Sequence, residues 1–201
     1  MYLFFDTETN GKAKSFFAPP TALDNWPRIT QLAWQLYDKD EKLISERCDL
    51  IKPDGWTVPK EQFFIENNMS TERCEEFGIP LLESVSAMIN DIERSEYMVA
   101  HNMKFDVNVL GAEFIRLKVK SQKKPEKICT MMTGTSYCKI PKARGGGHKW
   151  PTLTEMHVKL FGEGFSGAHD AMGDVLACAK SFFELKRVGH ILKEEKQLKA
   201  L

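Results

Sequence analysis

The segment YLFFDTETNG, residues 2–11, joins a short apolar run to two carboxylates. Residues 2–7 predict a short buried strand. Because positions i and i+2 of a strand point to the same face, Asp6 and Glu8 are expected to project together. Two neighbouring anions repel, and Mg²⁺, which takes carboxylate oxygens and completes its shell with water or phosphate, would relieve that repulsion. Taken alone, two acids at this spacing are more often an incidental pair.

Downstream of this segment, residues 29–37 and 42–51 predict two further strands, the second ending at the Pro-Asp-Gly turn of residues 53–55. Three early strands joined by loops predict an antiparallel meander. From residue 60 the apolar pattern becomes helical. Helices are expected at 84–92, 106–119, 152–161 and 169–188, and two more strands at 97–100 and 128–132. This order of elements predicts an α/β fold, in which helices pack on a mixed sheet.

The composition is typical of a folded globular chain. The 201 residues are 42% hydrophobic and 28% charged, which excludes a disulfide-stapled miniprotein and a disordered tail. The 28 Lys and Arg balance the 28 Asp and Glu, so no overall field draws the protein to polyanions or acidic membranes. Since no Pro- or Ser-rich linker and no internal repeat is present, we expect one domain over residues 1–201.

The cysteines and the apolar runs bear on the cellular compartment. Five cysteines without a C-x-x-C pair argue against a disulfide framework and a zinc ribbon, and they favour reduced thiols in a cytoplasmic protein. The first residues carry no basic leader, and no unbroken apolar run approaches the ~18 residues of a membrane span. We therefore expect neither a signal peptide nor a membrane partner.

Charge is distributed unevenly along the chain. Residues 116–149 contain ten Lys and Arg and one acid, Glu126, whereas residues 61–96 contain nine acids and two arginines. The basic segment is either a solvated face or a patch that contacts backbone phosphates. It includes the glycines at 145–147, but the G-x-x-x-x-G-K-[ST] pattern is absent, which excludes a triphosphate-binding loop of that kind.

Two later segments place polar residues at the starts of predicted helices. In HNMKFD, residues 101–106, Asp106 lies near a helix start, where an acid also simply complements the helix dipole. In HDAMGD, residues 169–174, His169 is expected in the loop or first turn, while Asp174 faces inward. A single histidine in such a place is more often structural than a base.

Together, these three segments resemble the exonuclease motifs of the DEDDh (DnaQ-like) family of 3′→5′ exonucleases, which includes the proofreading subunit of bacterial DNA polymerase III, RNase T and oligoribonuclease. The resemblance extends to about residue 185. It rests on Asp6-Thr7-Glu8-Thr9 with Gly11, on His101-Asn102 with Phe105-Asp106, and on His169-x-Ala171-x-x-Asp174. The resemblance implies a ribonuclease H-like fold, which is a five-stranded mixed sheet flanked by helices.

The resemblance also implies a metal site and a general base. Asp6, Glu8, Asp106 and Asp174 would ligate two divalent cations, Mg²⁺ or Mn²⁺, and His169 would be the base. By this assignment Asp6, Glu8 and Asp174 hold the ion that lowers the pKa of the attacking water, which His169 deprotonates. Asp6 and Asp106 hold the ion beside the departing 3′ oxygen. Because histidine has an ordinary pKa of about 6.5, the rate is expected to rise with pH through that region.

Residues around the motifs are candidates for substrate contacts. By the resemblance, Thr9 would contact the terminal nucleotide, although it could equally belong to a simple turn. Asn102 would either bind substrate or cap the following helix. Phe16, Phe17 and Trp26 would stack on unpaired bases or, at least as plausibly, cover the edge of the sheet.

We therefore predict a metal-dependent 3′→5′ exonuclease that releases nucleoside monophosphates from single-stranded 3′ ends. DNA is favoured over RNA as substrate, although the motifs do not distinguish the sugars, since that choice depends on contacts to the 2′ position. Association with a DNA polymerase and formation of a homodimer are both compatible with such a domain. The alternatives are an RNA 3′-trimming exoribonuclease, a structure-selective endonuclease, and a catalytically silent module that binds nucleic acid or protein on the same fold.

Overall fold

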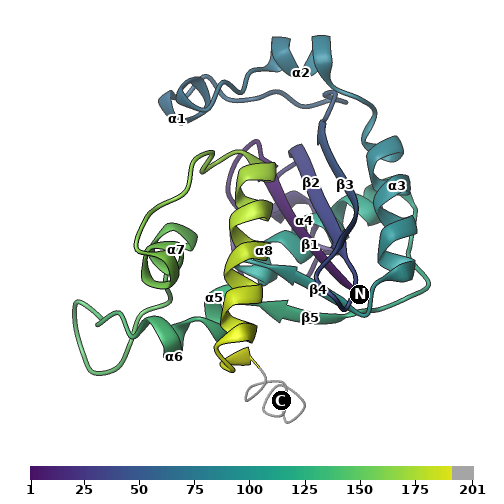
Figure 1. The fold of residues 1–201 in the computed structure, drawn as a ribbon. Coiled ribbons are helices and arrows are strands. Elements are labelled where there is room, and N and C mark those ends of the chain that lie inside the picture. Colours follow the sequence, from purple (N-terminus) through teal and green to yellow (C-terminus); the bar gives the residue numbers. More distant parts are fainter. Residues whose placement is uncertain (192–201) are drawn as a thin grey trace.

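Five strands form one mixed sheet at the centre of the computed structural model, which describes residues 1–191 (Figure 1). The strands are β1 (Tyr2–Thr9), β2 (Ile29–Tyr37), β3 (Leu43–Leu50), β4 (Tyr97–Ala100) and β5 (Glu126–Cys129). Their order is β3-β2-β1-β4-β5, antiparallel among β3, β2 and β1 and parallel from β1 through β4 to β5. The predicted meander and the predicted five-stranded mixed sheet are confirmed.

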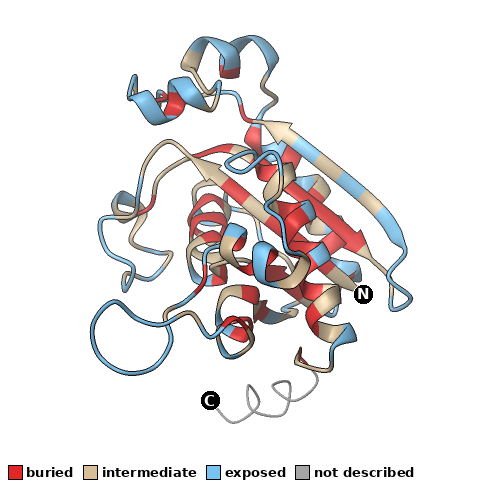
Figure 2. Cartoon of the chain, turned by 60° about the vertical axis from the view of Figure 1, so that its left-hand side comes forward, coloured by how far each residue is buried: buried red, intermediate tan, exposed pale blue. Residues whose placement is uncertain are grey.

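Helices cover both faces of this sheet. In chain order they are α1 (Gln62–Glu66), α2 (Thr71–Phe77), α3 (Leu81–Arg94), α4 (Met103–Leu117), α5 (Thr130–Thr133), α6 (Thr135–Cys138), α7 (Leu153–Phe161) and α8 (Ala171–Arg187), with a 3₁₀ turn at Leu23–Asn25. Leu3 and Phe5 of β1 pack with α3 and α4, whereas Phe4 packs with α7 and α8. A strand that is buried on both faces is apolar at successive positions, which explains the opening of the sequence. Figure 2 shows burial concentrated on the central strands and exposure along β3.

Two helices begin where their capping residues place them. α4 begins at Met103, before the predicted start at Asp106, because Asn102 has a left-handed backbone (φ 68°) that separates β4 from the helix. α7 follows Thr152, which forms a capping box with Glu155. Apolar periodicity locates the body of a helix, whereas the left-handed backbone of Asn102 and the capping box of Thr152 set the first residues of α4 and α7.

The predicted strand at 128–132 is wrong in its second half. β5 ends at Cys129, and Thr130 begins α5. The ladder to β4 ends at the pair Ala100 and Cys129, so the chain beyond it has no strand partner. The hydroxyl of Thr130 instead donates to the carbonyl of Ala100 (3.4 Å) and lies 3.0 Å from Nδ1 of His101. These side-chain contacts hold the chain in a helical turn at the end of the sheet.

The segment between β3 and α3 forms two short helices, α1 and α2, which the apolar pattern does not predict. Helices this short are unstable in isolation and depend on tertiary contacts. Here the contacts come from a small apolar cluster of Val58, Phe64 and Cys74, against which Trp56 and Met69 pack. Figure 1 places α1 and α2 beyond the end of the sheet at which α8 begins.

A buried ion-pair cluster ties the long loop between β1 and β2 to α4. The side chain of Glu113 is 0% exposed and accepts from Arg28 Nε at 2.7 Å and from Arg116 Nη1 at 3.0 Å. Arg116 also donates to the backbone carbonyls of Leu23 (2.6 Å) and Trp26 (2.8 Å). Trp26 itself is buried in the core, which excludes it as a base-stacking residue and agrees with the covering role.

Two further features concern membranes and thiols. Within residues 1–191, no helix is both long enough and apolar enough to cross a membrane. The five cysteines are free, and Cys74, Cys138 and Cys178 are buried.

Candidate active site

Four carboxylates converge where β1, α4 and α8 meet. Asp6 and Glu8 lie toward the C-terminal end of β1, at alternate positions that share one face of the strand. Asp106 comes from the first turn of α4, and Asp174 from the first turn of α8. The carboxyl ends of parallel strands are where α/β folds commonly bind ligands. The structure therefore brings the four predicted acids together at this edge of the sheet.

Thr7, which lies between the two acids of β1, orients Asp106. Strand alternation turns its side chain to the face opposite Asp6 and Glu8. The backbone N of Thr7 donates to Asp106 Oδ1 at 3.2 Å, and Thr7 Oγ1 donates to the same oxygen at 2.8 Å. Asp106 is buried, so these two bonds fix a carboxylate that has little contact with solvent. Thr7 is not among the predicted site residues. Strand alternation already shows that its side chain lies on the other face of β1 from Asp6 and Glu8.

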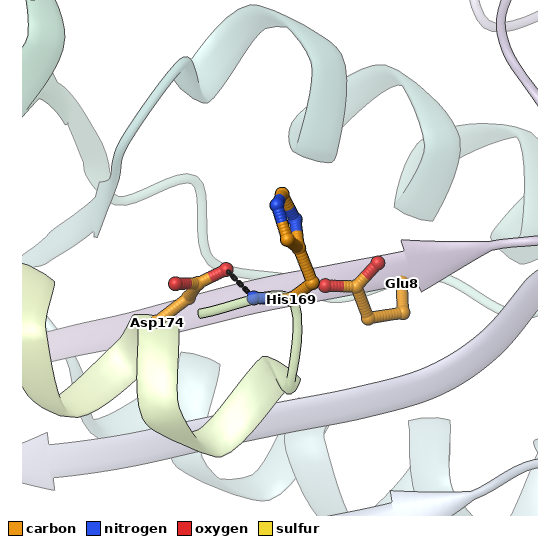
Figure 3. A group of neighbouring side chains, drawn as sticks. All are labelled: Glu8, His169 and Asp174. Atoms are coloured by element: carbon orange, nitrogen blue, oxygen red, sulfur yellow. Dashed lines mark hydrogen bonds between the residues drawn. The ribbon is translucent and has the colours of Figure 1, made fainter. Parts of the chain in front are cut away.

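Glu8, His169 and Asp174 form a compact cluster (Figure 3). One potential ligand atom from each side chain lies within 4.8 Å of the other two, and no other trio of His, Cys, Asp or Glu in residues 1–191 forms such a group. The backbone N of His169 donates to Asp174 Oδ2 at 3.3 Å. His169 is exposed and has a left-handed backbone (φ 66°), which places it in the loop before α8, one of its two predicted positions.

The start of α8 is bound to β2 through Gln31. Asp170 caps the helix with its side chain, so α8 begins at Ala171 and not at the predicted residue 169. Gln31 Nε2 donates to Asp170 Oδ1 (2.9 Å), and the backbone N of Ala171 donates to Gln31 Oε1 (3.1 Å). Gln31 is paired with Glu8 across the sheet, so these bonds align the start of α8 with the acids of β1.

Gly173 allows the loop before α8 to approach the helix closely. A Cβ atom at Gly173 would lie 2.2 Å from the carbonyl oxygen of Gly167, far inside van der Waals contact. Any larger residue would therefore displace the loop that carries His169.

Phe63 of α1 contacts the predicted base. The ring centroids of Phe63 and His169 are 5.3 Å apart, with the rings at 74° to each other. Neither Phe63 nor α1 belongs to the predicted site. A helix of five residues leaves no periodic signal, and the contact joins parts of the chain that are far apart in sequence.

The acids repel one another in a largely buried site. Burial first, and then the neighbouring carboxylates, raise the pKa of Glu8 to about 8. Burial raises the pKa of Asp106 to about 7, although the bonds from Thr7 oppose this, and it raises the pKa of Asp174 to about 6. Burial and the other acids also hold the pKa of Asp6 well above its ordinary range. No ion pair within residues 1–191 includes any of the four, so no Lys or Arg neutralises them.

This set of donors fits a divalent cation. Carboxylate oxygens are the ligands that Mg²⁺ prefers, and Mn²⁺ accepts the same oxygens. A bound cation neutralises the uncompensated negative charge of such a partly buried site. Glu8, His169 and Asp174 are close enough to share one ion. Asp6 lies near enough to the other three acids for each of them to raise its pKa.

The raised pKa values predict that the metal-free protein loses stability as the pH rises. In the unfolded chain these acids release their protons at about pH 4. In the folded protein, Glu8 and Asp106 keep theirs to about pH 8 and about pH 7. Between these limits the folded state binds more protons than the unfolded state, so the free energy of unfolding falls with increasing pH.

Thermal unfolding in EDTA checks this prediction. We expect a lower Tm at about pH 8 than at about pH 6, and a recovery on addition of Mg²⁺ or Mn²⁺ that is larger at the higher pH. The variant Asp106→Asn should show a shallower decline, because it removes one of the titrating groups. A Tm in EDTA that rises over this range would contradict the prediction.

Two predicted substrate-binding residues flank the acids. Thr9 ends β1, and its Oγ1 donates to the carbonyl of Gly11 at 2.8 Å, so the side chain closes the turn after the strand. Asn102 occupies the N-cap position of α4, but its side chain makes no capping hydrogen bond. Asn102 therefore has the predicted N-cap position without the side-chain hydrogen bond of a cap, and substrate binding by Asn102 stays a prediction.

Exposed aromatic rings lie on the loop after β1. Phe17 is 91% exposed, and Lys104 Nζ lies 4.9 Å from the centroid of its ring. Phe16 is about half exposed and contacts Phe105, with ring centroids 6.1 Å apart. Lys104 and Phe105 belong to the first turn of α4, as does Asp106.

The basic segment 116–149 does not form one patch beside the acids. It runs from the end of α4 through β5, α5 and α6 into the exposed loop 139–149, in which Pro141 and His148 form an isolated bridge. In Figure 1 this loop lies at the lower left, away from the N-terminal end of α8. Its position favours a solvated connector over a direct contact with the reacting phosphate.

Known proteins share both the sequence signature and the fold. An exonuclease family model, RNase T, matches residues 3–182. No curated protein sequence matches significantly. E. coli exonuclease I in complex with a dT13 oligonucleotide has a TM-score of 0.71 at 20% identity, over 100% of this chain and 45% of that one. The zinc-bound form of an E. coli exonuclease I complex with single-stranded DNA has a TM-score of 0.67 at 20% identity, over 92% and 40%. This chain spans less than half the length of those proteins, and the likeness shows a shared fold.

Proposed function

This chain belongs to the RNase T exonuclease family, of the DnaQ-like 3′→5′ type, and we propose that it is a metal-dependent exonuclease that acts on single-stranded 3′ ends, with DNA favoured. The observation that carries the proposal is the convergence of the four acids with His169 at the end of β1. Solved structures of E. coli exonuclease I contain dT13 and dA16 oligonucleotides, which supports DNA as substrate here. The products would be nucleoside monophosphates.

Two divalent cations, Mg²⁺ or Mn²⁺, would be held by the acids. Asp6, Glu8 and Asp174 would hold one, and Asp6 and Asp106 the other. When bound, such a pair activates water as the nucleophile and stabilises the charge that develops on the phosphoryl group and the leaving 3′ oxygen. The chain itself supplies placement, since Thr7 orients Asp106 through two hydrogen bonds.

His169 would accept the proton of the attacking water. Its ring is exposed, lies close to Glu8 and Asp174, and packs against Phe63. Histidine is the side chain that most often serves as a general base in enzymes. The left-handed backbone of His169 keeps the ring outside α8, where it can pass the proton to solvent.

The loop after β1 would bind the unpaired bases. Phe16 and Phe17 offer exposed rings, and Lys104 adds a cation beside them. Proteins commonly bind single-stranded nucleic acid through aromatic stacking combined with basic side chains. Asn102, in the turn before α4, and Thr9, at the end of β1, would contact the terminal nucleotide.

The remaining predictions concern the setting of the enzyme. Association with a DNA polymerase, formation of a homodimer and a cytoplasmic location stay predictions. The single domain over residues 1–201 also stays a prediction, and residues 192–201 lie outside the described part of the chain.

Degradation of a 5′-labelled single-stranded DNA oligomer and of its RNA equivalent tests the proposal. With Mg²⁺ or Mn²⁺ we expect a ladder that shortens from the 3′ end, faster on DNA than on RNA, and no products in EDTA. Asp174→Ala should abolish the ladder, because it removes a proposed metal ligand. Asp40→Ala, which removes an exposed acid after β2, should leave the ladder unchanged.

Each alternative activity gives a different product pattern. Internal cleavage that is indifferent to a blocked 3′ end would indicate a structure-selective endonuclease. Faster degradation of RNA would indicate a 3′-trimming exoribonuclease. No product with either metal on either substrate would overturn the proposal in favour of a silent binding module.

A further inference from the structure

A β-bulge lies beside the acids. In the pairing of β1 with β2, Glu8 is opposite Gln31 and Thr9 is opposite Ile29, which leaves Thr30 as an extra residue on β2. Bulges redirect side chains and are frequent next to active sites. The bulge therefore leaves Thr30 outside the regular pairing of β1 with β2.

Thr30 lines a small cavity that Glu8 and His169 of the candidate site also line. The cavity has room for about one water molecule. It lies between the bulge and the segment that contains α1. Phe63 of α1 and Asn67 form part of the walls on the side of that segment.

Two polar groups in these walls lack a partner among residues 1–191. Thr30 is 0% exposed, and its Oγ1 has no hydrogen-bond partner in this described part of the chain. The carboxylate of Glu8 also accepts no hydrogen bond from residues 1–191. Buried polar groups are rarely left unpaired, because each one forfeits the hydrogen bonds it made to water in the unfolded chain. A buried water with two to four polar partners is the usual way to satisfy such groups.

We propose that this cavity holds one buried water molecule, which accepts a hydrogen bond from Thr30 Oγ1 and donates one to the carboxylate of Glu8. Asn67 and His169, which also line the cavity, offer the water its remaining partners. Thr30 is then a positioning residue that acts on the metal site through this water and through Glu8. Hydrogen bonds to a ligating carboxylate from outside the metal site tune metal affinity. The inference rests on the proposed role of Glu8 as a metal ligand.

Direct measurement of Mn²⁺ binding tests the inference. Thr30→Val replaces the hydroxyl with a methyl group of nearly the same shape, and Thr30→Ser keeps the hydroxyl as the matched control. Binding is measured without nucleic acid, from the electron paramagnetic resonance signal of free Mn²⁺. We expect Thr30→Val to raise the Kd for Mn²⁺ about 10-fold and Thr30→Ser to change it little, since loss of an outer hydrogen bond weakens metal sites by about 10- to 100-fold.

A high-resolution crystal structure of the wild-type protein keeps the inference testable even if Thr30→Val folds poorly. Electron density for a water within hydrogen-bond distance of Thr30 Oγ1 and Glu8 is expected, and an empty cavity would overturn the inference. Unchanged Mn²⁺ affinity in Thr30→Val would also overturn it. If Mn²⁺ affinity is unchanged and Thr30→Val slows degradation of RNA but not of DNA, the cavity receives a sugar hydroxyl in place of water.

The binding experiment separates this inference from the proposed function. A wild-type protein whose Mn²⁺ affinity depends on the Thr30 hydroxyl but which degrades no nucleic acid would contradict the exonuclease proposal alone. A wild-type protein that degrades DNA while Thr30→Val binds Mn²⁺ normally would contradict the buried-water inference alone.

Discussion

Asp106→Asn is expected to lower kcat on single-stranded DNA by about 10³-fold or more, because a metal site supplies several kcal/mol of charge stabilisation in the transition state. Asn keeps the shape of the side chain and can still accept from Thr7, so the loss would reflect the missing charge. The same change should raise the Tm of the metal-free protein at about pH 8. It removes a buried carboxylate whose pKa is raised to about 7 and which is therefore charged at that pH.

Single-turnover rates at saturating Mn²⁺, together with Tm in EDTA, check this prediction. Asp40→Asn is the matched control, since it makes the same chemical change at an exposed position. An Asp106→Asn protein that retains more than about a tenth of the wild-type rate would exclude Asp106 as a metal ligand, given the size of the expected loss. Loss of activity together with a lower Tm in EDTA would instead indicate a structural defect.

Glu113→Gln is expected to lower the free energy of unfolding by about 3 kcal/mol, because removing one partner of a buried ion pair leaves the other charges uncompensated. Glu113 is 0% exposed, and Arg28 and Arg116 both donate to its Oε1. Gln has nearly the same volume as Glu, so the change isolates the charge from the packing. Urea unfolding monitored by circular dichroism measures the effect as a shift of the midpoint at constant slope.

Glu184→Gln is the control for this second prediction. It breaks an ion pair with Arg187, whose side chain is largely exposed, and such pairs contribute little to stability. We expect no measurable shift of the urea midpoint for this variant. A Glu113→Gln midpoint that coincides with the wild type would show that the cluster around Glu113 does not stabilise the fold.

The cluster around Glu113 also links stability to substrate binding. Arg116 donates hydrogen bonds to the carbonyls of Leu23 and Trp26, which lie at the end of the loop that carries Phe16 and Phe17. A loosened loop should raise KM for single-stranded DNA. A p-nitrophenyl ester of thymidine 5′-monophosphate offers little strand for that loop to bind, so the KM for this ester should change less than the KM for DNA.

Local patterns in the sequence were sufficient for the main elements. The strands at the start of the chain and the long helices follow from apolar periodicity, which is a property of neighbouring residues. The acid pair Asp6 and Glu8 follows from strand alternation. The site as a set, including Asp106, His169 and Asp174, came from the resemblance of three motifs to a known family, because no single motif distinguishes a metal ligand from an ordinary helix-start acid.

Contacts between distant parts of the chain decided how the site residues are held. Thr7 and Asp106 are 99 positions apart, and Gln31 and Asp170 are 139 apart, so no local window contains both partners of either bond. Trp26 shows the same limit, since the sequence leaves stacking and burial equally open and only the packing against the core selects burial. Periodicity is a property of neighbouring residues along the chain. The bulge at Thr30, the part of the cavity wall that α1 forms and the orientation of His169 exist only after the strands have paired and the helices have packed on the sheet.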